Sequence, residues 1–188
     1  MKKSSFVLRA LVAVSLAVPV MASAESQLVT GAGSANARLN FQVVIPRILF
    51  LGVGTGNDVL ATNPAVDTAV FDYTTNPTAV GTGAAAATIS GNAVPVRVLG
   101  NNGQVEITAA GSGTGLSNGT DTIPWSEITA TSSEGTFPVP AVGTTANPTL
   151  NAGRLTDRTA TWTYSFANSA VVAPGSYTGQ VTYTASMP

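Results

Sequence analysis

The chain has 188 residues, a formal net charge of −1, and neither cysteine nor histidine. Without these two residue types it can form neither a Ser-His-Asp triad nor a thiolate nucleophile, which argues against the commonest enzyme classes. The near-neutral charge, with no basic run, also argues against nucleic acid as a partner.

The first residues are typical of a secretory signal peptide. Met1-Lys2-Lys3 precede an apolar run from Phe6 to Val20, and the small residues Ala22-Ser23-Ala24 follow it. A basic start, a short apolar run and small residues before the cut are the marks of such a signal. We therefore expect a Sec signal peptide over 1–24, and an exported protein that reaches the extracellular space or cell surface through the periplasm.

Cleavage after Ala24 changes the charge of the chain. It removes Lys2, Lys3 and Arg9, three of the eight basic residues, and leaves five arginines against nine acidic residues. The mature chain then lacks lysine, so a Ser-Lys dyad is also absent, and we expect no enzyme activity and no catalytic residues. No second apolar run approaches the roughly 20 residues that a membrane-spanning helix needs, so we expect no membrane insertion.

Apolar residues alternate with polar ones from Arg38 to Pro46, and this pattern predicts a strand. Its apolar face consists of Leu39, Phe41, Val43 and Ile45. Pro46 ends the run, and a second predicted strand begins at once with Ile48 to Leu51. We expect an N-terminal extension over 25–46 and a folded domain over 47–188.

Three further alternating runs follow along the chain. Val94 to Val98 and Val105 to Ala109 flank Asn101-Asn102-Gly103, which predicts a hairpin, because an Asn-Gly pair between alternating runs favours a tight turn. Ala160 to Phe166 predicts a strand with one aromatic face. Tyr177 to Ala185 predicts a C-terminal strand with Tyr177, Val181, Tyr183 and Ala185 in its alternating series.

Weaker strand signals lie at 69–73, 85–90 and 123–131, which brings the expected total to eight or nine strands. The Gly, Thr, Ala and Pro stretches at 76–86, 111–120 and 132–153 are expected to be long surface connections. The fold class that this pattern predicts is an all-β sandwich.

No motif in the chain predicts a bound group. The glycines at 52–56 follow an apolar strand, but their spacing does not fit a dinucleotide loop. Asn118, Thr120 and Asp121 carry oxygens but lack the ligand spacing of a calcium loop, so a turn is the simpler interpretation. We expect no metal site and no cofactor.

The order of these segments resembles the subunits of chaperone-usher fimbriae, in particular those without cysteine. The shared features are a signal peptide, a polar leader, an alternating strand ended by Pro46, a second strand, and an alternating strand at the C-terminus. The likeness lies in this layout, which covers the whole mature chain.

The resemblance implies an immunoglobulin-like β-sandwich that a donated N-terminal strand completes. Leu39, Phe41, Val43 and Ile45 would be the donated side chains, and the strand with Tyr177, Val181, Tyr183 and Ala185 would border the groove and contact an assembly chaperone. The implied function is a structural subunit of an adhesive or biofilm filament. Its implied partners are copies of itself, a periplasmic chaperone and an outer-membrane usher.

Two alternatives stay open at this point. Residues 38–45 could be an ordinary first strand of their own sheet, since alternation shows that one face is buried but not in whose core. The chain could also be a self-contained secreted or surface β-sandwich that binds a carbohydrate or a protein. Trp125 is the one tryptophan outside an alternating run, and so the candidate for an exposed sugar contact.

Overall fold

The computed structural model describes residues 25–56 and 59–188, so the predicted signal peptide lies outside the described residues. The chain divides into two units, with the boundary between Ile45 and Pro46. We call residues 25–45 the extension and residues 46–188 the body.

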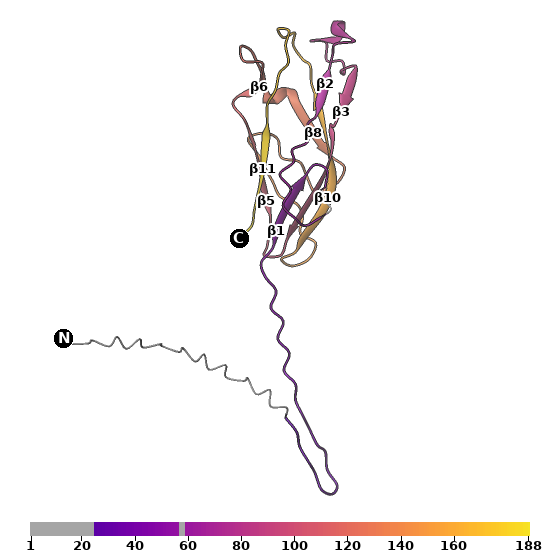
Figure 1. The fold of residues 1–188 in the computed structure, drawn as a ribbon, viewed down its shortest axis with the longest axis vertical. Helices are drawn as coiled ribbons and strands as arrows, with labels where there is room; N and C mark the ends of the chain where they lie inside the picture. Colours follow the sequence, from indigo (N-terminus) through magenta and orange to yellow (C-terminus); the bar gives the residue numbers. More distant parts are fainter. Residues whose placement is uncertain (1–24, 57–58) are drawn as a thin grey trace, which may run out of the picture. The chain divides into compact units, whose positions relative to one another are not determined.

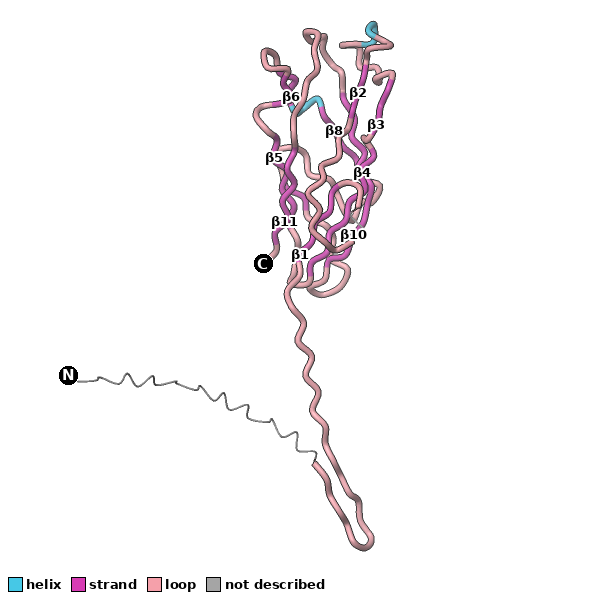
Figure 2. The backbone as a smooth tube through the Cα atoms, viewed as in Figure 1, coloured by secondary structure: helices cyan, strands magenta, loops and turns pink. Residues whose placement is uncertain are grey.

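The body is an all-β fold (Figures 1 and 2). Its described residues form eleven strands and two short 3-10 helices, where eight or nine strands were predicted. The elements in chain order are β1 (Leu49–Val53), β2 (Val70–Asp72), η1 (Pro77–Ala79), β3 (Thr88–Ser90), β4 (Ala93–Gly100), β5 (Glu106–Gly111), β6 (Gly115–Ser117), β7 (Thr122–Pro124), η2 (Trp125–Glu127), β8 (Ile128–Ser132), β9 (Thr145–Ala146), β10 (Thr156–Phe166) and β11 (Val181–Ser186). No helix among the described residues has the length and apolar character needed to cross a membrane.

Two larger sheets and two small ribbons make up the body. The four-stranded sheet has the order β1-β4-β10-β8, the three-stranded sheet has the order β11-β5-β9, and the ribbons are β2-β3 and β6-β7. All of the strand pairs are antiparallel. Buried residues of the two larger sheets join in one core, an arrangement consistent with a β-sandwich.

The alternating runs supply this core as predicted. On β4 the side chains of Val94, Val96 and Val98 are buried, whereas the residues between them are only half-buried. On β5 Ile107 and Ala109 are buried in the same alternating way. Successive side chains of a strand point to opposite faces, so this period of two identifies the inner face of each sheet.

The predicted hairpin at Asn101-Asn102-Gly103 is wrong. β4 and β5 lie in different sheets and do not pair, so the connection between them crosses from one layer to the other. Asn101 bonds to main-chain groups at Pro46 and Ile48, and Asn102 donates to the Pro188 carbonyl. The alternation correctly predicts which face of each strand is buried. It does not predict whether the two strands pair with each other or lie in opposite sheets.

The single strand predicted over 123–131 is interrupted. β7 ends at Pro124, the 3-10 helix η2 follows, and β8 begins at Ile128. Proline has no N–H for a strand ladder, which favours an end to pairing there. The interruption turns Trp125 against the three-stranded sheet, where its ring lies over Gly111 and Gly179.

The stretch 132–153 was expected to be a surface connection, and this expectation is wrong in part. Phe137 and Pro148 within it are fully buried. The Phe137 ring meets Trp162 edge-on at 5.3 Å between centroids, and the Phe137 carbonyl accepts a hydrogen bond from Ser132 Oγ. The part of this stretch before β9 connects β8 to β9, which are edge strands of opposite sheets. It thereby closes one side of the core.

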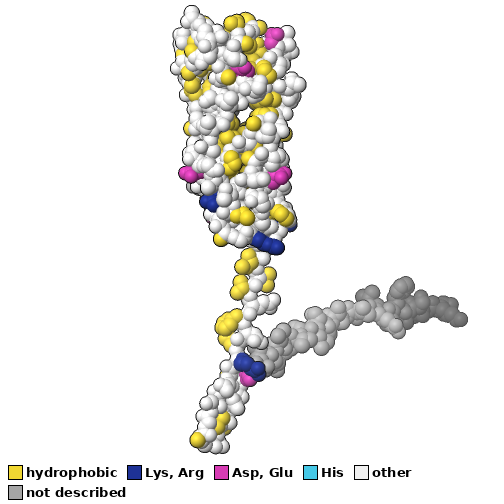
Figure 3. Space-filling view, turned by 180° about the vertical axis from the view of Figure 1, so that it is seen from behind, with side chains coloured by type: hydrophobic (Ala, Val, Ile, Leu, Met, Phe, Trp, Pro, Cys, Tyr) yellow, Lys and Arg dark blue, Asp and Glu magenta, His cyan; other side chains and the backbone are white. Residues whose placement is uncertain are grey.

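The extension contributes no strand among its described residues, so the strand predicted over 38–46 is not paired in this chain. Its first part folds back on itself: Arg38 donates two hydrogen bonds to the Glu25 carboxylate, at 2.9 and 3.0 Å, and the Asn36 N–H donates to the Gln27 side chain. This ion pair is exposed, and the hydrogen bonds lower the pKa of Glu25. Hydrophobic side chains follow along the rest of the extension (Figure 3).

Candidate functional site: the open side of the body

Two strand edges without a hydrogen-bonded neighbour lie next to each other in the body. β1 ends the four-stranded sheet and β11 ends the three-stranded sheet, and each has a single strand partner among the described residues. β1 and β11 come close to each other at one side of the core. We call this side, between β1 and β11, the open side.

Apolar side chains of both edges are left partly covered on the open side. Leu51 and Val53 on β1 pack against the core cluster but stay half-buried. Tyr183 and Ala185 on β11, with Met187 beyond it, do the same from the other sheet. The core is therefore less covered along this side than at its centre, where residues are fully buried.

A cluster of polar side chains joins the two edges at one end of the open side. The Arg47 guanidinium donates to the Met187 carbonyl at 2.7 Å, which connects the segment before β1 to the segment after β11. Asn101 accepts from the Ile48 N–H and donates to the Pro46 carbonyl, both at 2.8 Å. Asn102 adds a bond to the Pro188 carbonyl. We call Arg47, Asn101 and Asn102 the end clamp.

Two tyrosines form a polar contact between the sheets beside the open side. The hydroxyls of Tyr164 on β10 and Tyr183 on β11 lie 2.9 Å apart, and the Tyr183 ring also packs on Trp162. Burial raises the pKa of Tyr164 well above its ordinary value, and the charge that Tyr183 would carry raises it further. Burial likewise raises the pKa of Tyr183. Both hydroxyls are thus held in the neutral form.

Trp125 fills the end of the core opposite to the end clamp. A Cβ on Gly111 would approach the indole nitrogen to 2.3 Å, and a Cβ on Gly179 would approach the ring to 2.8 Å. Glycine at both positions lets the ring lie directly on the backbone of β5 and of the segment before β11. The ring is half-buried in this packing.

The structure brings together part of the site residues named from the sequence. Val181, Tyr183 and Ala185 lie on β11, which is an edge as the predicted groove requires. Tyr177 lies before β11, and its hydroxyl donates to the Ala173 carbonyl. The predicted donor side chains are exposed to extents of 75% for Leu39, 86% for Phe41, 82% for Val43 and 75% for Ile45.

Sequence reasoning missed the β1 half of the open side. Leu51 and Val53 are not among the site residues predicted from the sequence, although Leu49, Leu51 and Val53 form an alternating series of their own. The signal was present but short, because Gly52 and Gly54 interrupt the run. Met187, a further half-buried residue at this side, was also not named.

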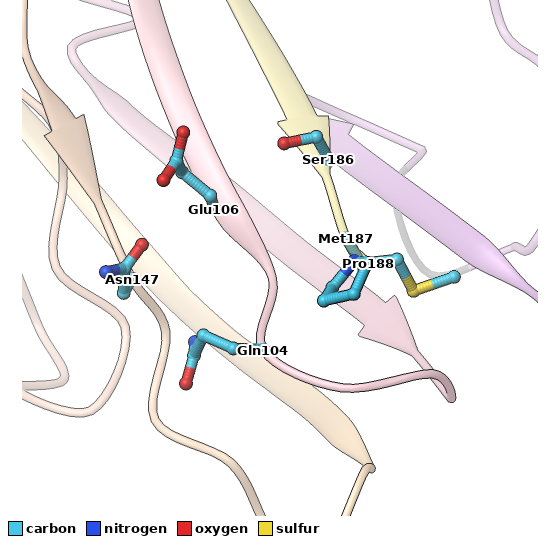
Figure 4. A pocket seen from close by; sticks show the side chains of 6 residues that line it. All are labelled: Gln104, Glu106, Asn147, Ser186, Met187 and Pro188. Carbon is cyan, nitrogen blue, oxygen red and sulfur yellow. The ribbon is translucent and has the colours of Figure 1, made fainter.

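A separate hollow of about 330 Å³ lies where β5 begins and β11 ends. Figure 4 shows its lining residues, with Glu106 on β5 and Ser186 at the end of β11. Its Gln104 side chain already donates to the carbonyls of Val105 and Pro148, and no aromatic ring lines it. Binding pockets are mostly apolar with a few placed polar groups, which this hollow does not resemble.

No group of three or more acidic, histidine or cysteine side chains that could hold a metal ion occurs within 25–56 and 59–188. Comparisons of the chain with protein-family models, with curated proteins and with solved structures found no match.

Proposed function

We propose that this chain is the structural subunit of an extracellular filament in which the extension of one copy completes the open side of the next. The single observation that carries the proposal is the pairing of two complementary features in one chain. The body has an incomplete apolar side between two unpaired strand edges, and the extension presents an exposed apolar series with the period of a strand.

The sheet order supports an immunoglobulin-like sandwich that lacks its last strand. Such a sandwich has strands A, B, E and D in one sheet and C, F and G in the other. The order β1-β4-β10-β8 fits A-B-E-D, and β11-β5 fits F-C. On this interpretation the place of strand G is beside β11, and no strand occupies it among the described residues.

The size of the apolar contact favours a tight joint. Burying the four side chains Leu39, Phe41, Val43 and Ile45 would contribute roughly 6 to 12 kcal/mol, at about 1.5 to 3 kcal/mol each. This sum is an upper bound because a free extension already hides part of its surface. Backbone hydrogen bonds to the edges of β1 and β11 would add to it.

Assembly partners are part of the same proposal. An exposed apolar edge invites uncontrolled pairing, so it needs cover until the correct strand arrives. A periplasmic chaperone that occupies the open side and an outer-membrane usher that exchanges it for the next extension would supply that cover. Adhesion and biofilm formation are the roles we propose for the filament, on the surface of an exporting cell.

The test uses the chain from residue 25 to 188 and charged substitutions in its extension. Phe41→Arg and Val43→Arg place a charge among the donated side chains, whereas Gln42→Arg places one on the opposite face of the same strand. We expect the parent and Gln42→Arg chains to form ladders that resist detergent in gel electrophoresis, and Phe41→Arg and Val43→Arg to remain monomers.

A second arm separates the donor from the acceptor. The Phe41→Arg chain keeps its own open side, so it should bind a peptide of residues 36–46, and the same peptide should cap the parent chain and shorten its ladders. A folded parent chain that stays a single monomeric species in size-exclusion chromatography, and binds no peptide, would show that the proposal is wrong.

A further inference from the structure

Charge is distributed unevenly between the two ends of the body. One end, which we call the acidic end, holds the ribbon β2-β3 with the segment before it, the loops before β4 and β11, the turn between β6 and β7, and the helix η2. The described charged side chains there are Asp67, Asp72, Asp121 and Glu127. No arginine or lysine occurs among the described residues of this end.

The other end, which we call the basic end, holds the segment before β1 and the turns before β5 and β10. Arg47, Arg154 and Arg158 lie there, and Glu106 begins β5 at the same end. Arg97 and Asp157 bond to each other at 3.6 Å and offset each other. In Figure 3 the blue side chains of the body gather at its lower end, whereas magenta ones reach its upper end.

The two ends are too far apart for their charges to cancel. β10 has 11 residues and runs between them, which at about 3.3 Å per residue gives roughly 35 Å. Charges in physiological salt are screened over about 8 Å. Each end therefore presents its own field to an approaching molecule.

One free charge at each end is available to such a molecule. Arg154 and Asp121 are both exposed, and neither side chain has a hydrogen bond or ion pair with another described residue. The other carboxylates of the acidic end are engaged locally, Asp67 by Thr55, Asp72 by Thr74 and Glu127 by Ser169. These hydrogen bonds lower the pKa of Asp72 and of Glu127, so both remain charged.

Completion of the open side by a strand would bring opposite ends of two copies together. A donated strand in the place of strand G would run antiparallel to β11. Its last residue, Ile45, would then lie near Val181 at the acidic end. Pro46 follows directly and begins the donor's own body at its basic end. The reverse direction would bring two basic ends together.

We propose that the basic end of one copy, through Arg154 and Arg47, docks on the acidic end of the next copy, through Asp121 and its neighbouring carboxylates. This contact rests on the proposed function, which supplies the strand that joins the copies. Its role is to steer the copies into head-to-tail order, since complementary charge acts mainly on the rate and orientation of association. It is a charged contact between bodies, separate from the apolar contact of the extension.

Charge reversal tests this contact in the chain 25–188. In Arg154→Glu the basic end loses its free cation and gains a carboxylate, and in Asp121→Arg the acidic end loses its free carboxylate and gains a cation. We expect each single substitution to slow assembly roughly two- to fivefold at low salt, the range of one or two exposed ion pairs. The chain with both substitutions again has opposite free charges at its two ends, and we expect its assembly rate to lie within about twofold of the parent rate. All four rates should converge at high salt.

Peptide binding separates this inference from the proposed function. Each substitution is repeated in the Phe41→Arg background, where we expect unchanged affinity for the peptide 36–46, because neither residue lies on β1 or β11. Peptide binding also reports a folded body. If the parent chain assembles and the peptide binds, but both single reversals assemble at the parent rate, the docking of the ends is refuted while strand exchange stands.

Discussion

The two long sides of the body differ in how the edges of the two sheets are covered. On the closed side, β8 and β9 are the edges of their sheets, and the chain itself connects them and inserts Phe137 into the core with 0% exposure. On the open side, β1 and β11 are the first and last strands of the body, and no described segment of the body runs between them to cover Leu51, Val53 and Tyr183. One side is completed from within the chain and the other is not.

Under the proposed function, this difference identifies the side of the core that a second molecule would complete. The aromatic contact of Phe137 with Trp162 anchors the closed side, and the Phe137 carbonyl also accepts from the Trp162 indole N–H at 3.4 Å. The apolar residues that we propose for the open side lie in the extension, before Pro46. Phe137 and Phe41 are thus the same residue type used inside the body and outside it.

The largest expected effect compares these two phenylalanines. Phe137→Ala empties a fully buried site and should lower the free energy of unfolding of the monomeric chain by about 3 to 5 kcal/mol. Phe41→Ala changes a side chain that is 86% exposed and should leave the monomer's free energy of unfolding unchanged. Denaturant titration of both variants at concentrations that keep the chain monomeric measures the difference. An equal loss in both would mean that the extension already packs in its own body.

The sequence predicted the faces of the strands better than their partners. The alternation of Val94 to Val98 and of Trp162 with its neighbours identified inner residues correctly, because burial of one face imposes a period of two on any half-buried strand. Pairing depends on the path of the connection. The Asn101-Asn102-Gly103 turn has the composition of a hairpin, yet the side chains of its two asparagines bond to the first and last segments of the body in the sequence.

Phe137 shows a second limit of the sequence. It is a lone aromatic residue among Ser, Gly, Thr and Pro, and no periodicity surrounds it. Its burial follows from the tertiary gap between β8 and β9, which no local pattern describes. The extension is the converse case, since its alternation is strong but the residues are exposed in the isolated chain.

An intermediate effect is expected at the end clamp. Asn101→Ala removes two side-chain hydrogen bonds to the main chain at Pro46 and Ile48. Each of these hydrogen bonds contributes about 0.5 to 1 kcal/mol, so the free energy of unfolding should fall by about 1 to 2 kcal/mol. Loss of the clamp should also loosen the spacing of β1 and β11, and so weaken binding of the peptide 36–46.

Asn147→Ala is the matched control, because Asn147 is exposed and its side chain has no hydrogen bond within the described part of the chain. It should change neither stability nor peptide binding. Equal behaviour of the two variants would show that the Asn101 bonds do not hold the edge of β1.

The smallest effect is a loss of stability at alkaline pH from the tyrosine pair beside the open side. Burial raises the pKa of Tyr164 in the folded chain above the value of about 10 that it has when unfolded. Its contribution to stability is therefore complete below pH 10 and is lost as the pH rises beyond that, because the unfolded chain releases the proton first. We expect Tyr164 to contribute a loss of about 1 kcal/mol by pH 11, measured by denaturant titration, and Tyr164→Phe, which keeps Tyr183, to show a smaller total loss. A strand on the open side would cover the pair further, so the peptide 36–46 bound to the Phe41→Arg chain should leave this alkaline loss undiminished or increase it. The same loss in Tyr164→Phe would assign it to other groups.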